Sequence, residues 1–129
     1  MVGPDTGAAE DFLAGSSLGL AVLVRVREAL VECHPDVTER VGRSQIAFRR
    51  RRGFAYLWMP NQYLRNPRAE VVLSLALRSR LDSPRFAEVV HPAPTTWMHH
   101  LDLHATADVD DEVAAWLVHA ADVAGPVAS

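Results

Sequence analysis

Residues 45–59 read Gln-Ile-Ala-Phe-Arg-Arg-Arg-Arg-Gly-Phe-Ala-Tyr-Leu-Trp-Met, and this segment decides the fold. Each half has a repeat of two residues. In the first half the large apolar residues Ile46 and Phe48 are two positions apart, and in the second half aromatic residues alternate with aliphatic ones. A period of two is typical of a β-strand with one buried face. The arginines and Gly53 between the halves favour a turn, so the segment predicts a β-hairpin.

Further strands are predicted on both sides of this hairpin. Residues 37–41 alternate in the same way and complete a meander of three short strands. A loop is expected at 60–68, and the strongly apolar run 71–77 predicts a central strand. Residues 97–103 predict a fifth strand after a proline-containing loop.

Helical patterns precede the strands. A short first helix is expected to begin at Asp5 or Thr6 and to stop at Gly15. A longer second helix is expected to run from a cap in the serine pair 16–17 to about Cys33, because its apolar residues recur at helical spacing.

Two more helices are predicted in the second half of the chain. A short one is expected where Ser83 precedes Pro84, since a hydroxyl cap followed by proline is a common helix start, with Phe86 as its core residue. Asp108 is expected to cap the last helix, and Gly125 is expected to end it.

This order of elements predicts an α+β domain. We expect about five strands in an antiparallel or mixed sheet, with two N-terminal helices and one C-terminal helix packed mainly on one face. The other face of such a sheet stays partly open, and the functional residues are expected there. Residues 8–124 are expected to form a single domain, with flexible termini at 1–7 and 125–129.

The composition is that of a globular chain with one cysteine. The 129 residues are 49% hydrophobic, which favours a folded domain. Cys33 has no cysteine partner for a disulfide or a metal cluster. The acidic N-terminus does not resemble a secretory signal, and the apolar run 18–24 is too short to cross a bilayer. We therefore expect a cytoplasmic protein outside the membrane, as a monomer or a small homo-oligomer.

Charge is unevenly distributed along the chain. All 13 basic residues are arginine, and 11 of them lie between Arg40 and Arg85, a segment with only two acids and a net charge of +9. The acids gather toward the ends, so the whole chain carries −3. A basic centre of this kind favours an anionic partner, which can be an anionic small molecule, a nucleic acid or an acidic protein.

Three segments resemble a known family. The stretch SQIAFRRRRGFA at 44–55 is similar to the signature hairpin of the bacterial domain-of-unknown-function family 5655, and so are WMHHLDL at 97–103 and the terminal helix at 108–121 with Trp116. The resemblance implies a small α/β domain, found alone or appended to other intracellular proteins. It also implies a remote similarity to a group with a proposed iron-chaperone role, and it assigns no catalytic residue.

The run Arg49-Arg50-Arg51-Arg52 is the strongest local signal. Adjacent guanidinium groups repel one another unless solvent, acids or phosphates lie near them, and they can bind phosphate or carboxylate through two parallel hydrogen bonds. Two interpretations stay open. The run either grips an anionic ligand or forms a solvated turn that pairs with the acidic ends of the chain.

Strand alternation places polar and aromatic side chains on the face expected to be open. This set consists of Gln45, Arg49, Tyr56 or Trp58, Ser74, Arg78, His100 and His104. Phe54, Tyr56 and Trp58 share one side of their strand, where they either stack on a flat ligand or belong to the core. The proposed ligand-binding residues are Arg49, Arg50, Arg51, Arg52, Tyr56, Trp58 and His100. They favour a non-enzymatic binding or accessory module for an anionic ligand, nucleic acid included.

A second hypothesis is metal handling. His100, Asp102 and His104 occupy alternate positions of one predicted strand, so they share a face and could hold iron or zinc. Residues two apart in a strand lie about 7 Å apart, which is wide for neighbouring ligands of one ion. A polar outward face is the other interpretation. His99, on the opposite side, is expected to be a hydrogen-bonded core histidine, and no other cofactor is expected.

An enzyme is the class with the least support. The serines lack a nucleophile-elbow context, and the scattered glycines form no phosphate-binding loop. No catalytic residue is therefore assigned. An acidic group beside His100 in a deep pocket would favour an enzyme.

Overall fold

The computed structural model describes residues 7–60 and 69–127. Its helices are α1 (Ala8–Phe12), α2 (Ser17–Val31) and α3 (Asp111–Ala124), and a short 3-10 helix, η2, spans Thr106–Asp108. Its strands are β1 (Thr38–Val41), β2 (Ile46–Arg49), β3 (Gly53–Trp58), β4 (Val71–Leu77), β5 (Glu88–Ala93) and β6 (Thr96–Leu103). The α+β class predicted from the sequence is confirmed.

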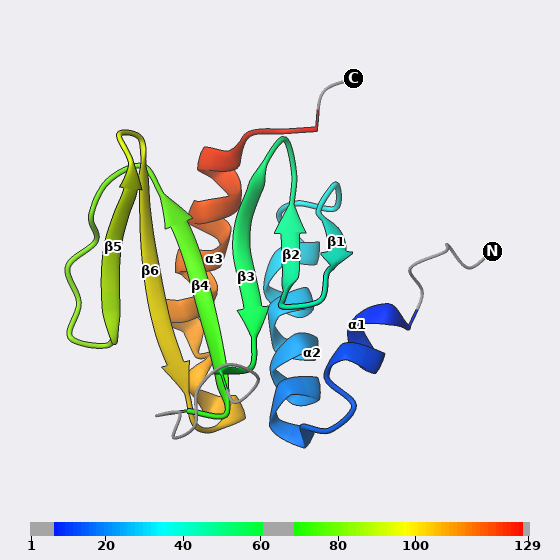
Figure 1. The fold of residues 1–129 in the computed structure, drawn as a ribbon. Helices are drawn as coiled ribbons and strands as arrows, with labels where there is room; N and C mark the ends of the chain where they lie inside the picture. Colours follow the sequence, from blue (N-terminus) through cyan, green and yellow to red (C-terminus); the bar gives the residue numbers. More distant parts are fainter. Residues whose placement is uncertain (1–6, 61–68, 128–129) are drawn as a thin grey trace.

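The strands form one antiparallel sheet in the order β1-β2-β3-β4-β6-β5. Figure 1 shows this sheet from the front, with α2 and α3 behind it. Helix α3 packs against β3 and β4, and α2 packs against α3. The long helices therefore cover one face, and none of the described helices lies across the other.

The strand that the sequence did not predict is β5, at one edge of the sheet. It pairs with β6, contains Pro92 and is mostly exposed. An edge strand needs ladder hydrogen bonds on one side only, so it tolerates proline and polar residues. Without an apolar alternation, its sequence predicts a loop, and the described sheet has six strands rather than about five.

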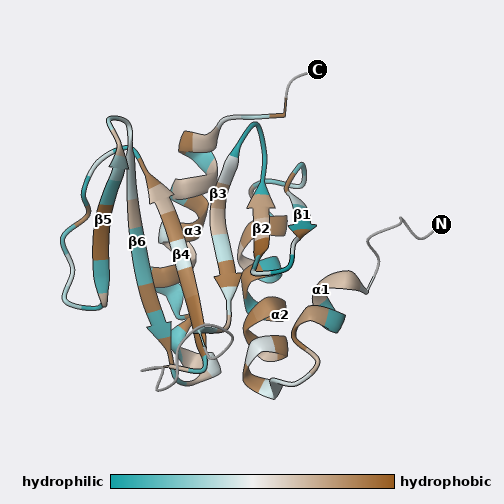
Figure 2. Ribbon diagram, in the orientation of Figure 1, coloured by the Kyte–Doolittle hydropathy of each residue, from teal (hydrophilic) through white to brown (hydrophobic). Residues whose placement is uncertain are grey.

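The core lies between the sheet and the helices. The cross-strand row Leu57–Leu73–Leu101 belongs to the buried core cluster, and each such side chain contributes about 2 kcal/mol when fully buried. Strand β4 is buried over most of its length, and Figure 2 shows it as a largely hydrophobic strand at the centre of the sheet. Because side chains alternate along a strand, the neighbouring row must face the open side.

The start of α2 agrees with the sequence. Ser16 caps the helix, and its hydroxyl accepts a hydrogen bond from the backbone N–H of Gly19 at 2.8 Å. Helix α1 follows Gly7, whereas its predicted start at Asp5 or Thr6 lies outside the described residues.

The predicted cap of α3 was wrong by two residues. Asp110 caps this helix by accepting from the N–H of Val113 at 3.1 Å. Asp108 belongs to η2 and accepts from the N–H of His104 at 2.8 Å. Several acids precede α3 and each has the chemistry of a cap, so the local sequence does not choose between them.

The segment between β4 and β5 is a loop rather than the predicted short helix. The Ser83 hydroxyl accepts from the N–H of Arg85 at 3.2 Å, and its carbonyl accepts from the N–H of Phe86 at 3.3 Å, which makes a turn. The Phe86 ring is 9% exposed and lies 4.9 Å from the ring of His99 and 4.7 Å from that of Trp116. Phe86 is thus the predicted core residue, although no helix carries it.

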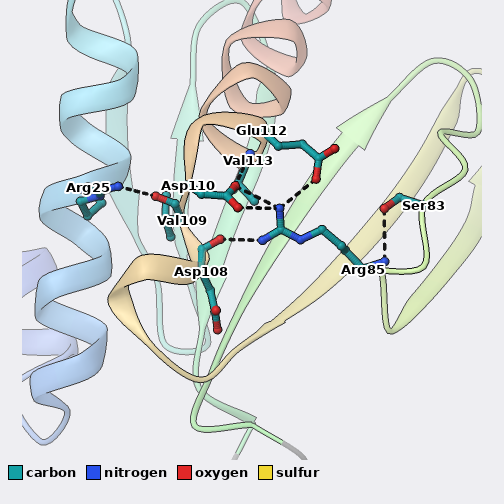
Figure 3. A network of polar contacts seen from close by, with 8 residues as sticks. All are labelled: Arg25, Ser83, Arg85, Asp108, Val109, Asp110, Glu112 and Val113. Carbon is teal, nitrogen blue, oxygen red and sulfur yellow. Dashed lines mark hydrogen bonds and ion pairs between the residues drawn. The ribbon is translucent and has the colours of Figure 1, made fainter.

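Arg85 fastens this loop to the start of α3 (Figure 3). Its Nη1 lies 3.0 Å from both carboxylate oxygens of Asp110 and 2.9 Å from Glu112, and its Nη2 donates to the Asp108 carbonyl at 2.9 Å. The hydrogen bond from Arg85 lowers the pKa of Asp110 below its usual value. The guanidinium also lies 5.7 Å from the centre of the Trp116 ring. Arg85 therefore holds the N-terminal end of α3 in place, although β5 and β6 separate the loop from this helix in the sequence.

Candidate functional site on the open sheet face

One cross-strand row runs over the centre of the open face. Antiparallel pairing aligns Tyr56 with Ser74, Ser74 with His100, and His100 with Glu88. These residues come from β3, β4, β6 and β5, which lie side by side in Figure 1. The pairing therefore brings together side chains that are distant in sequence.

Three side chains of this face form a hydrogen-bonded chain. Nε1 of Trp58 donates to Oγ of Ser74 at 2.9 Å, and Oγ of Ser74 lies 2.6 Å from Nδ1 of His100. The rings of Trp58 and His100 meet edge to face, with their centres 6.2 Å apart. Ser74 is only 2% exposed, so its hydroxyl group lies beneath the two rings and fixes their positions through these hydrogen bonds.

The imidazole of His100 is neutral at neutral pH. Burial lowers its pKa below the usual value, and the charges of Glu88 and Asp102 offset that effect only in part. Ser74 receives a hydrogen bond from Trp58 and can donate its own proton to Nδ1 of neutral His100. In this arrangement Nε2 carries the remaining proton, and among the described residues it has no hydrogen-bond partner.

A cavity of about 460 Å³ lies over this chain. It is lined by Ser44, Gln45, Tyr56, Trp58, Ser74, Met98 and His100. Its walls combine two aromatic rings and a thioether with an amide, hydroxyls and an imidazole. Such a lining suits a small molecule with a flat apolar part and a few polar groups.

Tyr56 reaches from this cavity toward the β2–β3 turn. Its hydroxyl group lies against Gly53, where any β-carbon would collide with it, and Arg49 Nη1 lies 3.5 Å from the same point. Glycine at position 53 therefore makes room for the tyrosine. The Arg49 guanidinium and the Tyr56 hydroxyl group converge at this end of the open face.

The arginine run does not act as one group. Arg50 turns to the helix side, where Nε donates to Asp36 at 2.9 Å and Nη1 to the carbonyl of Ala121 at 2.8 Å. The backbone N–H of Arg51 donates to the carbonyl of Gly125. An acid of the same chain therefore compensates the charge of Arg50, and the ligand-binding role expected of the run stays a prediction.

The predicted aromatic row is wrong at one residue. Phe54 is 1% exposed and belongs to the core, whereas Tyr56 and Trp58 line the open cavity. The β2–β3 register shifts at Phe48 and Arg49, so that Phe54 is an additional residue opposite β2. A bulge of this kind redirects a side chain that strict alternation would place outward.

The histidine pattern proposed for metal binding is not brought together as a metal site. His104 lies beyond the end of β6 and is exposed, while His100 is engaged with Ser74. Within residues 7–60 and 69–127, no group of three or more His, Cys, Asp or Glu residues is arranged to hold a metal ion. The strand ends at Leu103, so alternation no longer directs His104.

The Ser74–His100 pair has the atoms of a nucleophile and a base, and Glu88 lies beside the histidine. Ser74, however, sits in the middle of β4, between β3 and β6. The backbone N–H groups around it belong to the sheet ladders and cannot form an oxyanion hole. The Ser74–His100 hydrogen bond is therefore better explained as a contact that positions the two side chains than as the nucleophile and base of an acyl-transfer site.

Sequence reasoning missed three residues of this region. Met98 precedes His100 by two positions in β6, so strand alternation alone places it on the same face as His100. Ser44 directly precedes Gln45, which was predicted to lie on this face. Glu88 lies in the unpredicted strand β5, and its approach to His100 follows only from strand pairing.

Acidification is expected to destabilise the fold in two stages. Burial lowers the pKa of His99 and of His100 from 6.5, so on acidification the unfolded chain takes up these protons first. The stability they provide is complete above 6.5 and declines as the pH falls toward the lowered values. Asp36 and Asp110, with pKa values lowered from 3.8, lose their contribution only in stronger acid.

Thermal melting measured between about pH 8 and pH 5 tests the first stage. The melting temperature is expected to fall on the acidic side, and His99→Phe is expected to flatten the curve. A profile that stays level in the wild type would contradict the assignment.

The comparison with protein families matches nearly the whole chain to one family. The sequence profile described as Domain of unknown function (DUF5655) matches residues 9–124. The chain belongs to this family. Comparisons with curated proteins and with solved structures find no match. The DUF5655 match spans every residue that lines the open-face cavity, so the cavity is part of the family domain and not of an appended segment.

The longest helix that the structure describes in this DUF5655 domain is α2, with 15 residues. Among the residues that the structure describes, none of the helices has both the length and the apolar character needed to span a membrane.

Proposed function

We propose that this DUF5655 domain is a binding module that holds a small anionic ligand with a flat ring on its open sheet face. The observation that carries the proposal is the Trp58–Ser74–His100 chain beneath a cavity of about 460 Å³. Ser74 orients an indole and an imidazole before any ligand arrives. Preorganised walls of this kind lower the entropy cost of binding.

The charges around the cavity favour one anionic group rather than a long polyanion. Arg49 lies at the end of the face near the β2–β3 turn, while Glu88 and Asp102 lie around His100 on the other side. A ligand is expected to direct its anionic group toward the arginine end. A nucleic-acid strand that continued past His100 would meet the carboxylate of Glu88, so nucleic acid is the less favoured ligand.

Calorimetric titration with adenosine monophosphate tests the proposal, because this probe combines a flat base with one phosphate. Trp58→Ala is expected to weaken binding by about fivefold to 150-fold, since stacking on one aromatic side chain is worth about 1–3 kcal/mol. Trp97→Ala is the matched control: the Trp97 ring stacks on His91 with the ring centres 3.8 Å apart, and it does not line the cavity.

Two outcomes would contradict the proposal. One is absence of binding by the wild type, and the other is equal affinity of the Trp58→Ala and Trp97→Ala variants. A short single-stranded oligonucleotide gives a further measurement. It is expected to bind no tighter than the mononucleotide, and an affinity that rises with its length would indicate a nucleic-acid interface instead.

A further inference from the structure

A second cavity adjoins the first at the end of the sheet. It measures about 220 Å³ and lies where β3 begins, β4 ends and β6 begins. Tyr56 and Met98 line both cavities, so they form a shared wall. The polar side chains that line only the second cavity are those of Arg52, Arg78, Thr95 and Thr96.

The second cavity contains positive charge that the protein itself does not compensate. Arg27, Arg50 and Arg85 each make ion pairs with acids. Arg52 and Arg78 make no ion pair among the described residues, although they line one cavity together. Both arginines are exposed and carry the same charge, so an anion that reached the cavity between them would be attracted by both.

The end of α3 also borders this cavity, through Val123 and Ala124. The carbonyl groups at a helix C-terminus carry partial negative charge, which could compensate nearby arginines. Here Arg50 already donates to the carbonyl of Ala121, and the N–H of Gly125 donates to that of Asp122 at 3.2 Å. Much of the helix end is thus satisfied by other groups, and Arg52 and Arg78 stay available.

We infer that the second cavity is a phosphoryl subsite and that the ligand of the open face is a phosphorylated planar molecule, such as a nucleoside monophosphate. The inference rests on the function proposed above. The ring lies over Trp58 and His100, and the phosphoryl group lies beyond Tyr56 between Arg52 and Arg78. Two guanidinium forks and two threonine hydroxyls offer enough donors for the three terminal oxygens of a phosphate.

The decisive experiment compares adenosine with adenosine monophosphate by calorimetry. The phosphate is expected to raise the affinity of the wild type at least about tenfold, because hydrogen bonds to a charged group are stronger than neutral ones. Arg52→Ala and Arg78→Ala are expected to remove most of this difference while leaving adenosine binding unchanged. Arg51→Ala is the matched control, since it removes a neighbouring charge that lines neither cavity.

Inorganic phosphate separates this inference from the proposed function. It is expected to compete with adenosine monophosphate in the wild type and to lose that effect in the Arg52→Ala and Arg78→Ala double variant. If the monophosphate still binds more tightly than adenosine in the Arg52→Ala and Arg78→Ala double variant, and Trp58→Ala weakens both ligands, the subsite is refuted and the proposed function stands. Equal binding of adenosine and the monophosphate by the wild type would overturn both. If phosphate binds through the two arginines but Trp58→Ala has no effect on the monophosphate, the proposed function fails and the anion subsite stands. An equal loss in Arg51→Ala would show a general effect of charge and overturn the subsite.

Discussion

Replacing His99 with alanine is expected to lower the free energy of unfolding by about 3 kcal/mol. His99 is fully buried, and its Nε2 accepts from the N–H of Leu81 at 2.9 Å while Nδ1 lies 3.0 Å from the carbonyl of Trp97. The ring also packs against Phe86. Alanine would leave a void and an unpaired N–H group at Leu81, and both effects oppose folding. Urea denaturation measures the change.

A second variant separates the two causes. His99→Phe keeps most of the volume and loses only the hydrogen bonds, so it is expected to cost about 1–2 kcal/mol. Two results would contradict this explanation of what His99 contributes to stability. Unchanged stability of His99→Ala would show that the histidine is not a core residue, and equal losses in both variants would show that the void is not important.

Replacing Arg85 with alanine is expected to destabilise the protein by about 2 kcal/mol. The change removes the donors that hold Asp110, Glu112 and the Asp108 carbonyl, and it leaves several negative groups together at one helix end (Figure 3). It also removes the group that fastens the loop carrying Phe86 to α3. Urea denaturation again measures the loss.

Arg80→Ala is the matched control for this prediction. Arg80 belongs to the same loop, and its pair with Asp82, at 3.1 Å, is largely exposed. An exposed ion pair contributes little, so the expected loss is below about 0.5 kcal/mol. Similar losses in the two variants would mean that the contacts of Arg85 contribute no more than an ordinary surface pair. Arg85→Lys is expected to be intermediate, because lysine keeps the charge but not the planar fork.

Local sequence patterns predicted most of the regular elements. The apolar run at 71–77 became β4 with the same bounds, and α2 is capped by Ser16, one of the two serines expected to do so. These predictions hold because alternation and capping act over a few residues. The loop after β4 did not form the helix that Ser83 and Pro84 indicate. There, long-range contacts of Arg85 and Phe86 outweigh a weak local preference.

Part of the candidate site could also be read from the sequence. Alternation correctly assigned Gln45, Tyr56, Trp58, Ser74 and His100 to the open face, and the structure brings all five to one cavity. It failed where alternation was interrupted. The bulge opposite Phe48 turned Phe54 inward, and the end of β6 separated His104 from the strand pattern.

Where a strand is regular, the sequence by itself determined which of its residues share a face, because side chains alternate along any unbulged strand whatever its neighbours are. Strand order and register were decided only in the tertiary structure, since they depend on pairing between segments far apart in the chain. The same packing sent Arg50 to Asp36 while Arg52 lines a cavity with Arg78. Adjacent arginines are equivalent in sequence, and their roles differ because the turn directs them to surroundings of different charge.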